Sequence, residues 1–111
     1  MENNDLVRLK HMLDSAQAIL SFLKGKKRAS LDSDRMLASA VSRELEIIGE
    51  AAGKISEKTR KKFPKLPWSQ LIGMRNRLIH AYFDVNHDTV WDTVKNEIPK
   101  LVTELEKIVK G

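Results

Sequence analysis

Arg75 and His80 are the two residues of this 111-residue chain whose types and spacing could perform chemistry together. They lie in the segment GMRNRLIHAYF, residues 73–83, which also contains Tyr82. An arginine can bind two phosphate oxygens and stabilise the extra charge of a pentavalent transition state. A histidine can take a proton from a ribose 2′-hydroxyl or give one to the leaving 5′-oxygen. The pair is therefore sufficient for metal-independent cleavage of RNA, which would leave a 2′,3′-cyclic phosphate.

Arg75 occupies an unusual place on the helix that this segment predicts. At 3.6 residues per turn it lies near the centre of an apolar arc, while Asn76, Arg77 and His80 lie on the opposite arc. Burial of an unpartnered guanidinium is costly, so three interpretations compete. In the first, Arg75 pairs with Glu44, a charged residue within the apolar stripe of an earlier helix. In the second, Arg75 buries only its stem and its charged end reaches the solvent. In the third, Arg75 lies in a cleft, where a phosphate or another subunit supplies its partner.

Arg75 and His80 do not share one face of a regular helix, so a site that contains both needs an additional structural feature. They are five positions apart in the sequence, so they point about 140° apart around a regular helix. A joint site requires the arginine to reach around, the helix to loosen before His80, or a second copy of the chain to close over the edge. Asn76, four residues before His80, could fix the imidazole tautomer. One histidine serves one of the two proton transfers, and a symmetric dimer would supply both.

Several basic residues could bind the phosphate backbone of RNA. The net charge is +5 and the pI is about 9.6. The segment KISEKTRKKFPK predicts RNA contacts at Lys58, Arg60, Lys61 and Lys62, and Arg77 lies on the polar arc of the motif helix. A simply solvated basic surface explains such a segment equally well. Trp68 and Trp91 stand beside apolar neighbours and are predicted to belong to the core.

Other chemistries find little support in the sequence. The chain has no cysteine, which excludes disulfides and thiolate metal sites. Its three histidines show no metal-ligand spacing, and no glycine-rich phosphate loop or GxSxG segment is present. No metal and no cofactor are expected. The polar N-terminus and the lack of a long apolar run predict a cytoplasmic protein without a membrane segment.

Helical periodicity predicts the elements that position these residues. An apolar stripe runs from Leu6 to Leu23, with Asn3 or Asn4 as cap and Gly25 as the end. Further helices are expected over residues 33–53, 56–63 and 67–83. The last helix should start after a cap at Asp84 or Asn86 and break near Pro99. No segment shows the alternation of apolar and polar residues with a period of two that would predict a β-strand. Residues 1–111 therefore predict one all-α domain, an up-and-down bundle of four to five helices.

The segment RNRLIHAYF resembles the Arg-x4-His-x-Tyr motif of HepT-type toxins in the HEPN superfamily. The similarity extends to LEIIGEAAGKIS, PWSQLIGMRNRLIHAYFDVN and VWDTVKNEIPKL, and so covers nearly the whole chain. The resemblance implies a HEPN-like bundle that dimerises through the motif helices. It also implies a metal-independent endoribonuclease acting on mRNA or tRNA, with Arg75 and His80 as catalytic residues.

The same resemblance implies supporting residues and a partner. Asn76 matches the polar residue after the arginine, and Glu50 in the GEA segment would help to shape the site, beside the pairing role considered for Glu44. Tyr82 matches the tyrosine to which a minimal nucleotidyltransferase antitoxin adds AMP units. Two other functions stay open. The chain could be a non-catalytic nucleotide- or partner-binding subunit of a nucleotidyltransferase complex, or a basic bundle that only binds nucleic acid.

Overall fold

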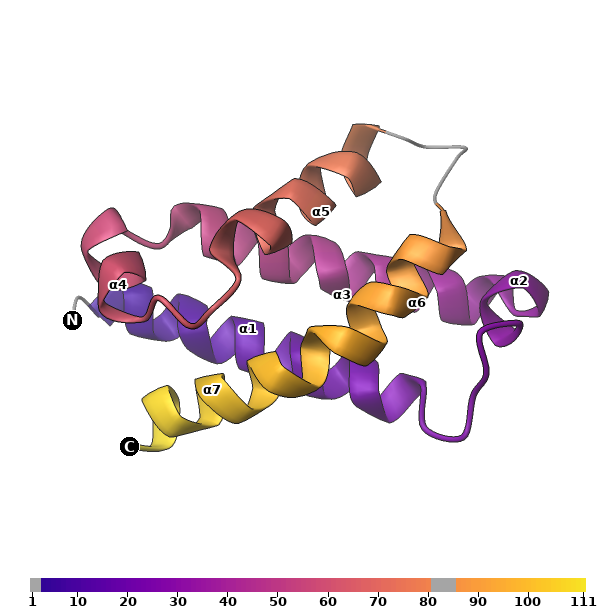
Figure 1. The fold of residues 1–111 in the computed structure, drawn as a ribbon, viewed down its shortest axis with the longest axis horizontal. Coiled ribbons are helices and arrows are strands. Elements are labelled where there is room, and N and C mark those ends of the chain that lie inside the picture. Colours follow the sequence, from indigo (N-terminus) through magenta and orange to yellow (C-terminus); the bar gives the residue numbers. More distant parts are fainter. Residues whose placement is uncertain (1–2, 81–85) are drawn as a thin grey trace.

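The computed structural model describes residues 3–80 and 86–111, and of His80 it describes the backbone alone. These two ranges consist of helices joined by short loops (Figure 1), and no strand occurs in them. The helices are α1 (Asn3–Phe22), α2 (Ser30–Ser33), α3 (Arg35–Lys54), α4 (Glu57–Lys62), α5 (Trp68–His80), α6 (His87–Asn96) and α7 (Ile98–Lys110). The predicted all-α class is confirmed.

The long helices run alternately in opposite directions (Figure 1). α3 lies at the centre, where it packs against α1 on one side and α5 on the other, and α7 packs against α1. The short helix α4 lies at the end of the bundle where α5 begins, and α2 lies at the opposite end. The arrangement is the predicted up-and-down bundle. Within the described ranges, no helix combines the length and apolarity needed to span a bilayer.

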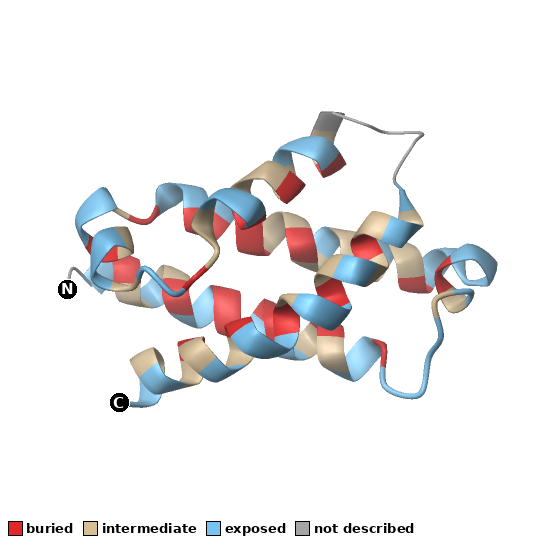
Figure 2. Cartoon of the chain, in the orientation of Figure 1, coloured by how far each residue is buried: buried red, intermediate tan, exposed pale blue. Residues whose placement is uncertain are grey.

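The apolar stripes of the long helices meet in one core, visible as the inward-facing red segments of Figure 2. Each stripe recurs at three- and four-residue intervals, which places it on one side of its helix. The side chains with the least exposure include Leu9, Met12, Ile19, Leu31, Val41, Ile48, Val94, Ile98, Leu101 and Leu105. Most of the predicted stripe residues are buried here. Leu6, the first residue of the predicted stripe, is an exception, because it is only half-buried.

Short polar side chains set where the helices begin. Asp34 accepts a hydrogen bond from the backbone N–H of Leu37 at the start of α3. The predicted start at Ser33 is therefore two residues too early, because Ser33 ends the short helix α2 and α3 begins at Arg35. Asn86 accepts from two backbone N–H groups in the first turn of α6, as its predicted role as a cap requires. The other candidate, Asp84, lies outside the described residues.

The break predicted near Pro99 falls at Glu97, between α6 and α7. Pro99 stands in the first turn of α7, where a residue without an N–H group loses no helical hydrogen bond. Gly25 follows the end of α1 with φ = 75°, a left-handed conformation that suits glycine. These features turn the chain between the helices that the apolar pattern predicts.

A buried carboxylate joins the first helix to the fourth. Asp5 is only 1% exposed and accepts three hydrogen bonds. They come from the Ser56 hydroxyl at 2.6 Å, the Thr59 hydroxyl at 2.6 Å and the Ser56 backbone N–H at 3.2 Å. These bonds favour the charged form and outweigh the effect of burial, so the pKa of Asp5 lies below its ordinary value. Because Ser56 also caps α4, Asp5 fixes the position of that helix.

Replacement of Asp5 by asparagine should lower the free energy of unfolding at neutral pH by about 2 kcal/mol, because charge-assisted hydrogen bonds to a buried group are lost. A depressed folded pKa stabilises the protein above the unfolded pKa, and this contribution disappears as the pH falls through the folded pKa. Urea unfolding of the wild type and the variant should therefore show a difference in the free energy of unfolding at pH 7, and this difference should become smaller in acid. A difference independent of pH would contradict this assignment.

Candidate active site

The motif helix α5 meets α3 at a glycine. A Cβ atom built on Gly49 would overlap the Cβ of Arg75 and would lie 2.6 Å from the backbone oxygen of Leu71. No residue larger than glycine fits between these two backbones as they stand. Gly49 therefore determines how closely α5 approaches α3, and it places the stem of Arg75 directly against α3.

Arg75 is half-buried, with its stem inside the bundle and its end at the surface. Its Nε is buried and finds no hydrogen-bond acceptor among the described residues. Its Nη1 donates to the Oδ1 of Asn76 at 3.2 Å, on the exposed side of the helix. The structure agrees with the interpretation in which only the stem is buried. The outer nitrogens of the guanidinium are thus left at the surface, where a phosphate could reach them.

The ion pair between Arg75 and Glu44, the first of the three interpretations, does not form in the described parts of the chain. Gly49 marks the side of α3 that faces Arg75, and Glu44, five residues earlier, points about 140° away from it. Glu50 is rotated by about 100° from Gly49. It is exposed, lies 3.5 Å from Lys54, and lines a groove between α1 and α3. A supporting role for either carboxylate stays a prediction.

α5 is helical through His80, its last residue. The possibility that the helix loosens before His80 is therefore excluded. Within one chain, Arg75 and His80 start from opposite sides of a regular helix, so a joint site needs the reach of the arginine or a second copy. The side chain of His80, its predicted contact with Asn76, and Tyr82 lie outside the described residues.

A cavity of about 670 Å³ opens beside the C-terminal part of α5. The buried leucines Leu31 and Leu78 form part of its floor. The rest of its lining comes from α2, α3 and α6, namely Asp32, Arg35, Ala38, Ser39, Ser42, Arg43, Glu46 and His87. Sequence reasoning missed Arg35 and Arg43 in this region. The sequence shows the spacing of the two arginines along α3, but it does not show that they line the same cavity as Leu78 of α5.

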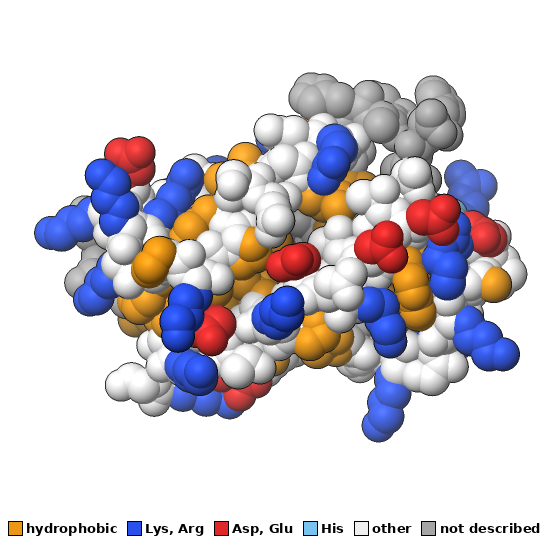
Figure 3. Space-filling model, viewed as in Figure 1, with side chains coloured by type: hydrophobic (Ala, Val, Ile, Leu, Met, Phe, Trp, Pro, Cys, Tyr) orange, Lys and Arg blue, Asp and Glu red, His pale blue; other side chains and the backbone are white. Residues whose placement is uncertain are grey.

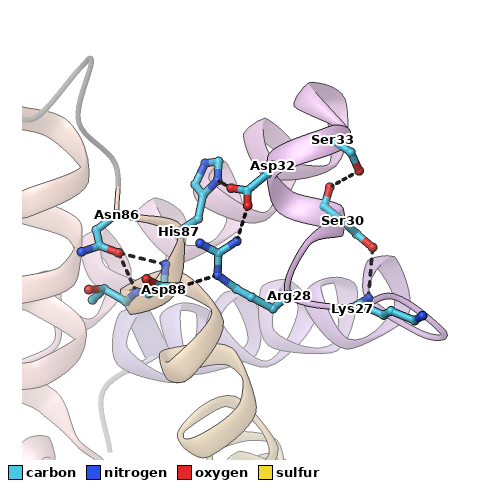
Figure 4. Close-up of polar contacts among 9 residues, drawn as sticks. Lys27, Arg28, Ser30, Asp32, Ser33, Asn86, His87 and Asp88 are labelled. Carbon is cyan, nitrogen blue, oxygen red and sulfur yellow. Dashed lines mark hydrogen bonds and ion pairs between the residues drawn. The ribbon is translucent and has the colours of Figure 1, made fainter.

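A polar network fixes one wall of this cavity (Figure 4). The Nδ1 of His87 lies 2.8 Å from an Asp32 carboxylate oxygen, and Arg28 donates to the other oxygen at 3.0 Å. Arg28 also bonds Asp88 at 2.6 Å. The contacts from His87 and Arg28 hold the pKa of Asp32 below its ordinary value, and Asp88 and Asp32 raise that of Arg28. The network ties α2 to the first turn of α6, just after the motif.

The four residues around α4 that are predicted to bind RNA lie away from the end of the motif helix. Lys58, Lys61 and Lys62 are exposed on α4, and Lys and Arg side chains are visible at that end of the molecule as well as at the opposite end (Figure 3). Arg60 differs from them, because it donates to the backbone oxygens of Gly53 and Ile55 at the end of α3. α4 lies near the start of α5, and the twelve residue steps from Trp68 to His80 correspond to about 18 Å.

Arg77 is exposed on α5, closer to His80 than the α4 residues are in the chain. No group of three potential metal ligands occurs among the residues that the structure describes. In the described part of one chain, then, Arg75 and Arg77 share the motif helix with the backbone of His80, and the α4 lysines lie at the other end.

The fold and this arrangement define a class: small helical bundles that present an Arg-x4-His motif on a helix packed against the central one. The family described as "Ribonuclease HepT-like" matches residues 12–108. The chain therefore belongs to the HepT-like family of the HEPN superfamily, as its sequence suggested.

Relatives of known name support this assignment. "Putative RNase MJ1216" of Methanocaldococcus jannaschii is 42% identical over 99 residues, which cover 89% of this chain and 82% of the relative. "Putative RNase TTE0752" of Caldanaerobacter subterraneus subsp. tengcongensis is 37% identical, covering 92% and 91%. "Probable ribonuclease HepT" of Thermococcus cleftensis is 44% identical over 77 residues, covering 69% and 70%. No solved structure gives a significant match.

Proposed function

We propose that this protein is a metal-independent endoribonuclease with Arg75 and His80 as its catalytic residues. One observation carries the proposal: in a chain of the HepT-like family, Arg75 is held against Gly49 with its outer nitrogens at the surface, five residues from His80. A purely structural arginine would be expected to have an internal carboxylate partner, and the described residues provide none. The names of the relatives indicate ribonucleases.

The proposed reaction is transesterification within the RNA. The 2′-oxygen attacks the adjacent phosphorus as His80 removes its proton, so that a new P–O2′ bond forms. Arg75 stabilises the pentavalent phosphorane. The P–O5′ bond then breaks, and the 5′-oxygen receives a proton as it leaves. The products are a 2′,3′-cyclic phosphate and a 5′-hydroxyl.

A homodimer through the motif helices supplies the second proton transfer in this proposal. The regular helix between Arg75 and His80 supports it, because side chains about 140° apart on one helix can still face a common cleft formed by two copies. In such a cleft one histidine acts as base and the histidine of the second copy acts as acid. Asn76, which bonds Arg75, would orient the guanidinium toward the phosphate.

The proposed biological setting is a cytoplasmic toxin–antitoxin pair with mRNA or tRNA as the target. A cognate minimal nucleotidyltransferase would transfer AMP from ATP to the Tyr82 hydroxyl and release pyrophosphate. The added anion, two residues from His80, would obstruct the cleft and repel RNA. Incubation with this enzyme and ATP should increase the mass by AMP units and stop cleavage, whereas Tyr82→Phe should gain no mass. Mass gain by the phenylalanine variant would place the modification elsewhere.

The proposed activity is tested with purified, unmodified protein and a defined single-stranded RNA in excess EDTA. We expect fragments that end in a 2′,3′-cyclic phosphate, identified by mass, and none from a His80→Ala variant purified in the same way. An RNA with 2′-O-methyl groups should resist cleavage, because its nucleophile is blocked. If a folded, dimeric wild type yields no fragments, the non-catalytic nucleotide- or partner-binding subunit becomes the better description.

A further inference from the structure

A second hollow, of about 510 Å³, lies between α4 and the beginning of α5. Its apolar lining consists of two prolines, a leucine and a tryptophan, and its polar lining includes two cationic side chains. The lining residues are Glu57, Arg60, Lys61, Pro64, Leu66, Pro67, Trp68, Ser69 and Gln70. The function proposed above does not use this hollow, which lies at the opposite end of α5 from His80.

Trp68 has a fixed position in this hollow. Its Nε1 donates to the backbone oxygen of Phe63 at 3.0 Å, and its backbone N–H donates to the backbone oxygen of Leu66 at 2.9 Å. The side chain packs on the core as the sequence predicted, yet it is only half-buried and lines the hollow. A tryptophan whose N–H is bonded inside and whose ring is partly exposed needs no reorganisation before another flat ring stacks on it.

The charges around the hollow are mainly positive. Lys61 and Arg60 line it, with Glu57 as the one acidic residue of its lining. Lys58, Lys62 and Lys65 are exposed on the same short segment, and Figure 3 shows Lys and Arg side chains at this end of the molecule as well as at the opposite end. Arg60 is already bonded to the end of α3, so Lys61 is the lining residue best placed to bind a phosphate. The combination of an aromatic ring and neighbouring lysines is typical of surfaces that bind single-stranded nucleic acid.

We infer that this hollow is a subsite for one nucleobase of single-stranded RNA, which stacks on Trp68 while Lys61 binds an adjacent phosphate. Ser69 and Gln70 supply polar groups at the edge of the base. The inference rests on the proposed function, since it gives the RNA a second contact about 18 Å along α5 from His80. Cleavage would then occur a few nucleotides away from the base held by Trp68.

Tryptophan fluorescence tests the stacking directly. The chain has two tryptophans, so the Trp91→Phe variant reports on Trp68 alone, and Trp68→Phe reports on Trp91. Each variant is titrated with a 2′-O-methyl RNA oligonucleotide, which binds but cannot be cleaved. We expect saturable quenching of Trp68 and little change for Trp91. Quenching of Trp91 alone, or of neither residue under conditions where anisotropy shows binding, would overturn the subsite.

Charge reversal tests the phosphate contact. Lys61→Glu should weaken binding of the labelled oligonucleotide about tenfold and lower the salt dependence of the affinity. Lys100→Glu, the same change at an exposed position of α7, should have little effect and serves as the control. If both changes weakened RNA binding equally, the loss would be explained by the change in net charge alone, and the contact between Lys61 and a phosphate would be overturned. Circular dichroism and thermal melting confirm that both variants are folded.

These measurements separate the subsite from the catalytic proposal. If the wild-type protein cleaves RNA and the Trp91→Phe variant binds the oligonucleotide without any change in its fluorescence, the subsite is disproved and the ribonuclease remains. Saturable quenching and an effect of Lys61→Glu in a protein that cleaves nothing disproves the ribonuclease and supports the subsite.

Discussion

Arg75→Lys should reduce RNA cleavage at least about a hundredfold while the fold is retained, because lysine cannot reproduce the planar fork of donors that stabilises a phosphorane. The lysine stem can still pack against Gly49, so the structural role of the residue is largely kept. Initial rates on a defined oligonucleotide measure the loss. Circular dichroism and thermal melting of the same sample measure the fold.

Two further variants sharpen the interpretation of this loss. Asn76→Ala removes the hydrogen-bond acceptor of Arg75 and should have a smaller effect, since the guanidinium itself remains. Arg77→Ala removes a neighbouring exposed charge and should mainly weaken RNA binding. Arg75→Lys with wild-type cleavage rates would show that the residue contributes only a positive charge, and the proposed transition-state contact would be wrong.

Gly49→Ala should both destabilise the protein and reduce cleavage, although the change adds only one methyl group. The new Cβ would overlap Arg75 and lie 2.6 Å from the Leu71 carbonyl oxygen, so α5 must move away from α3. Overpacking of this kind typically costs about 1–3 kcal/mol. Urea unfolding measures the loss of stability, and cleavage at a temperature where the variant is fully folded measures the displacement of Arg75.

Gly53→Ala provides the matched control on the same helix. A Cβ at Gly53 meets nothing within 4 Å, and alanine favours the helical conformation by about 0.5–1 kcal/mol over glycine. This variant should therefore be slightly more stable than the wild type. If both alanine variants gained stability, the close contact between α3 and α5 would not restrict position 49.

Much of the fold follows from the sequence because each helix carries its own periodic signal. Leu9, Leu13 and Ala16 recur at intervals that put them on one side of α1, and all three are buried. The break before Pro99 and the cap at Asn86 depend on local chemistry that a few residues specify. Such features need no knowledge of neighbouring helices. For the same reason they say little about the site.

The candidate site depends on how two helices are rotated relative to one another, which no single helix records. Glu44 and Arg75 both lie within apolar stripes, and their pairing was a reasonable expectation from the sequence. In the structure, Gly49 rather than Glu44 faces Arg75. The contact of Asp32 with His87 joins residues 55 positions apart and carries no local signal. Arg75 and His80 themselves could be proposed from the sequence because they lie in one contiguous motif.

The contact between Gly49 and Arg75 also has an evolutionary consequence. The bonds among Arg28, Asp32 and Asp88 leave more freedom for substitution, because both carboxylates are exposed and Arg28 is partly exposed. The α3–α5 crossing gives no such freedom, since any side chain at position 49 competes with the stem of Arg75 for the same space. The two positions are therefore expected to be epistatic. A lineage that enlarges residue 49 must move α5 or relinquish the arginine, so the smallness of one residue preserves the chemistry of another.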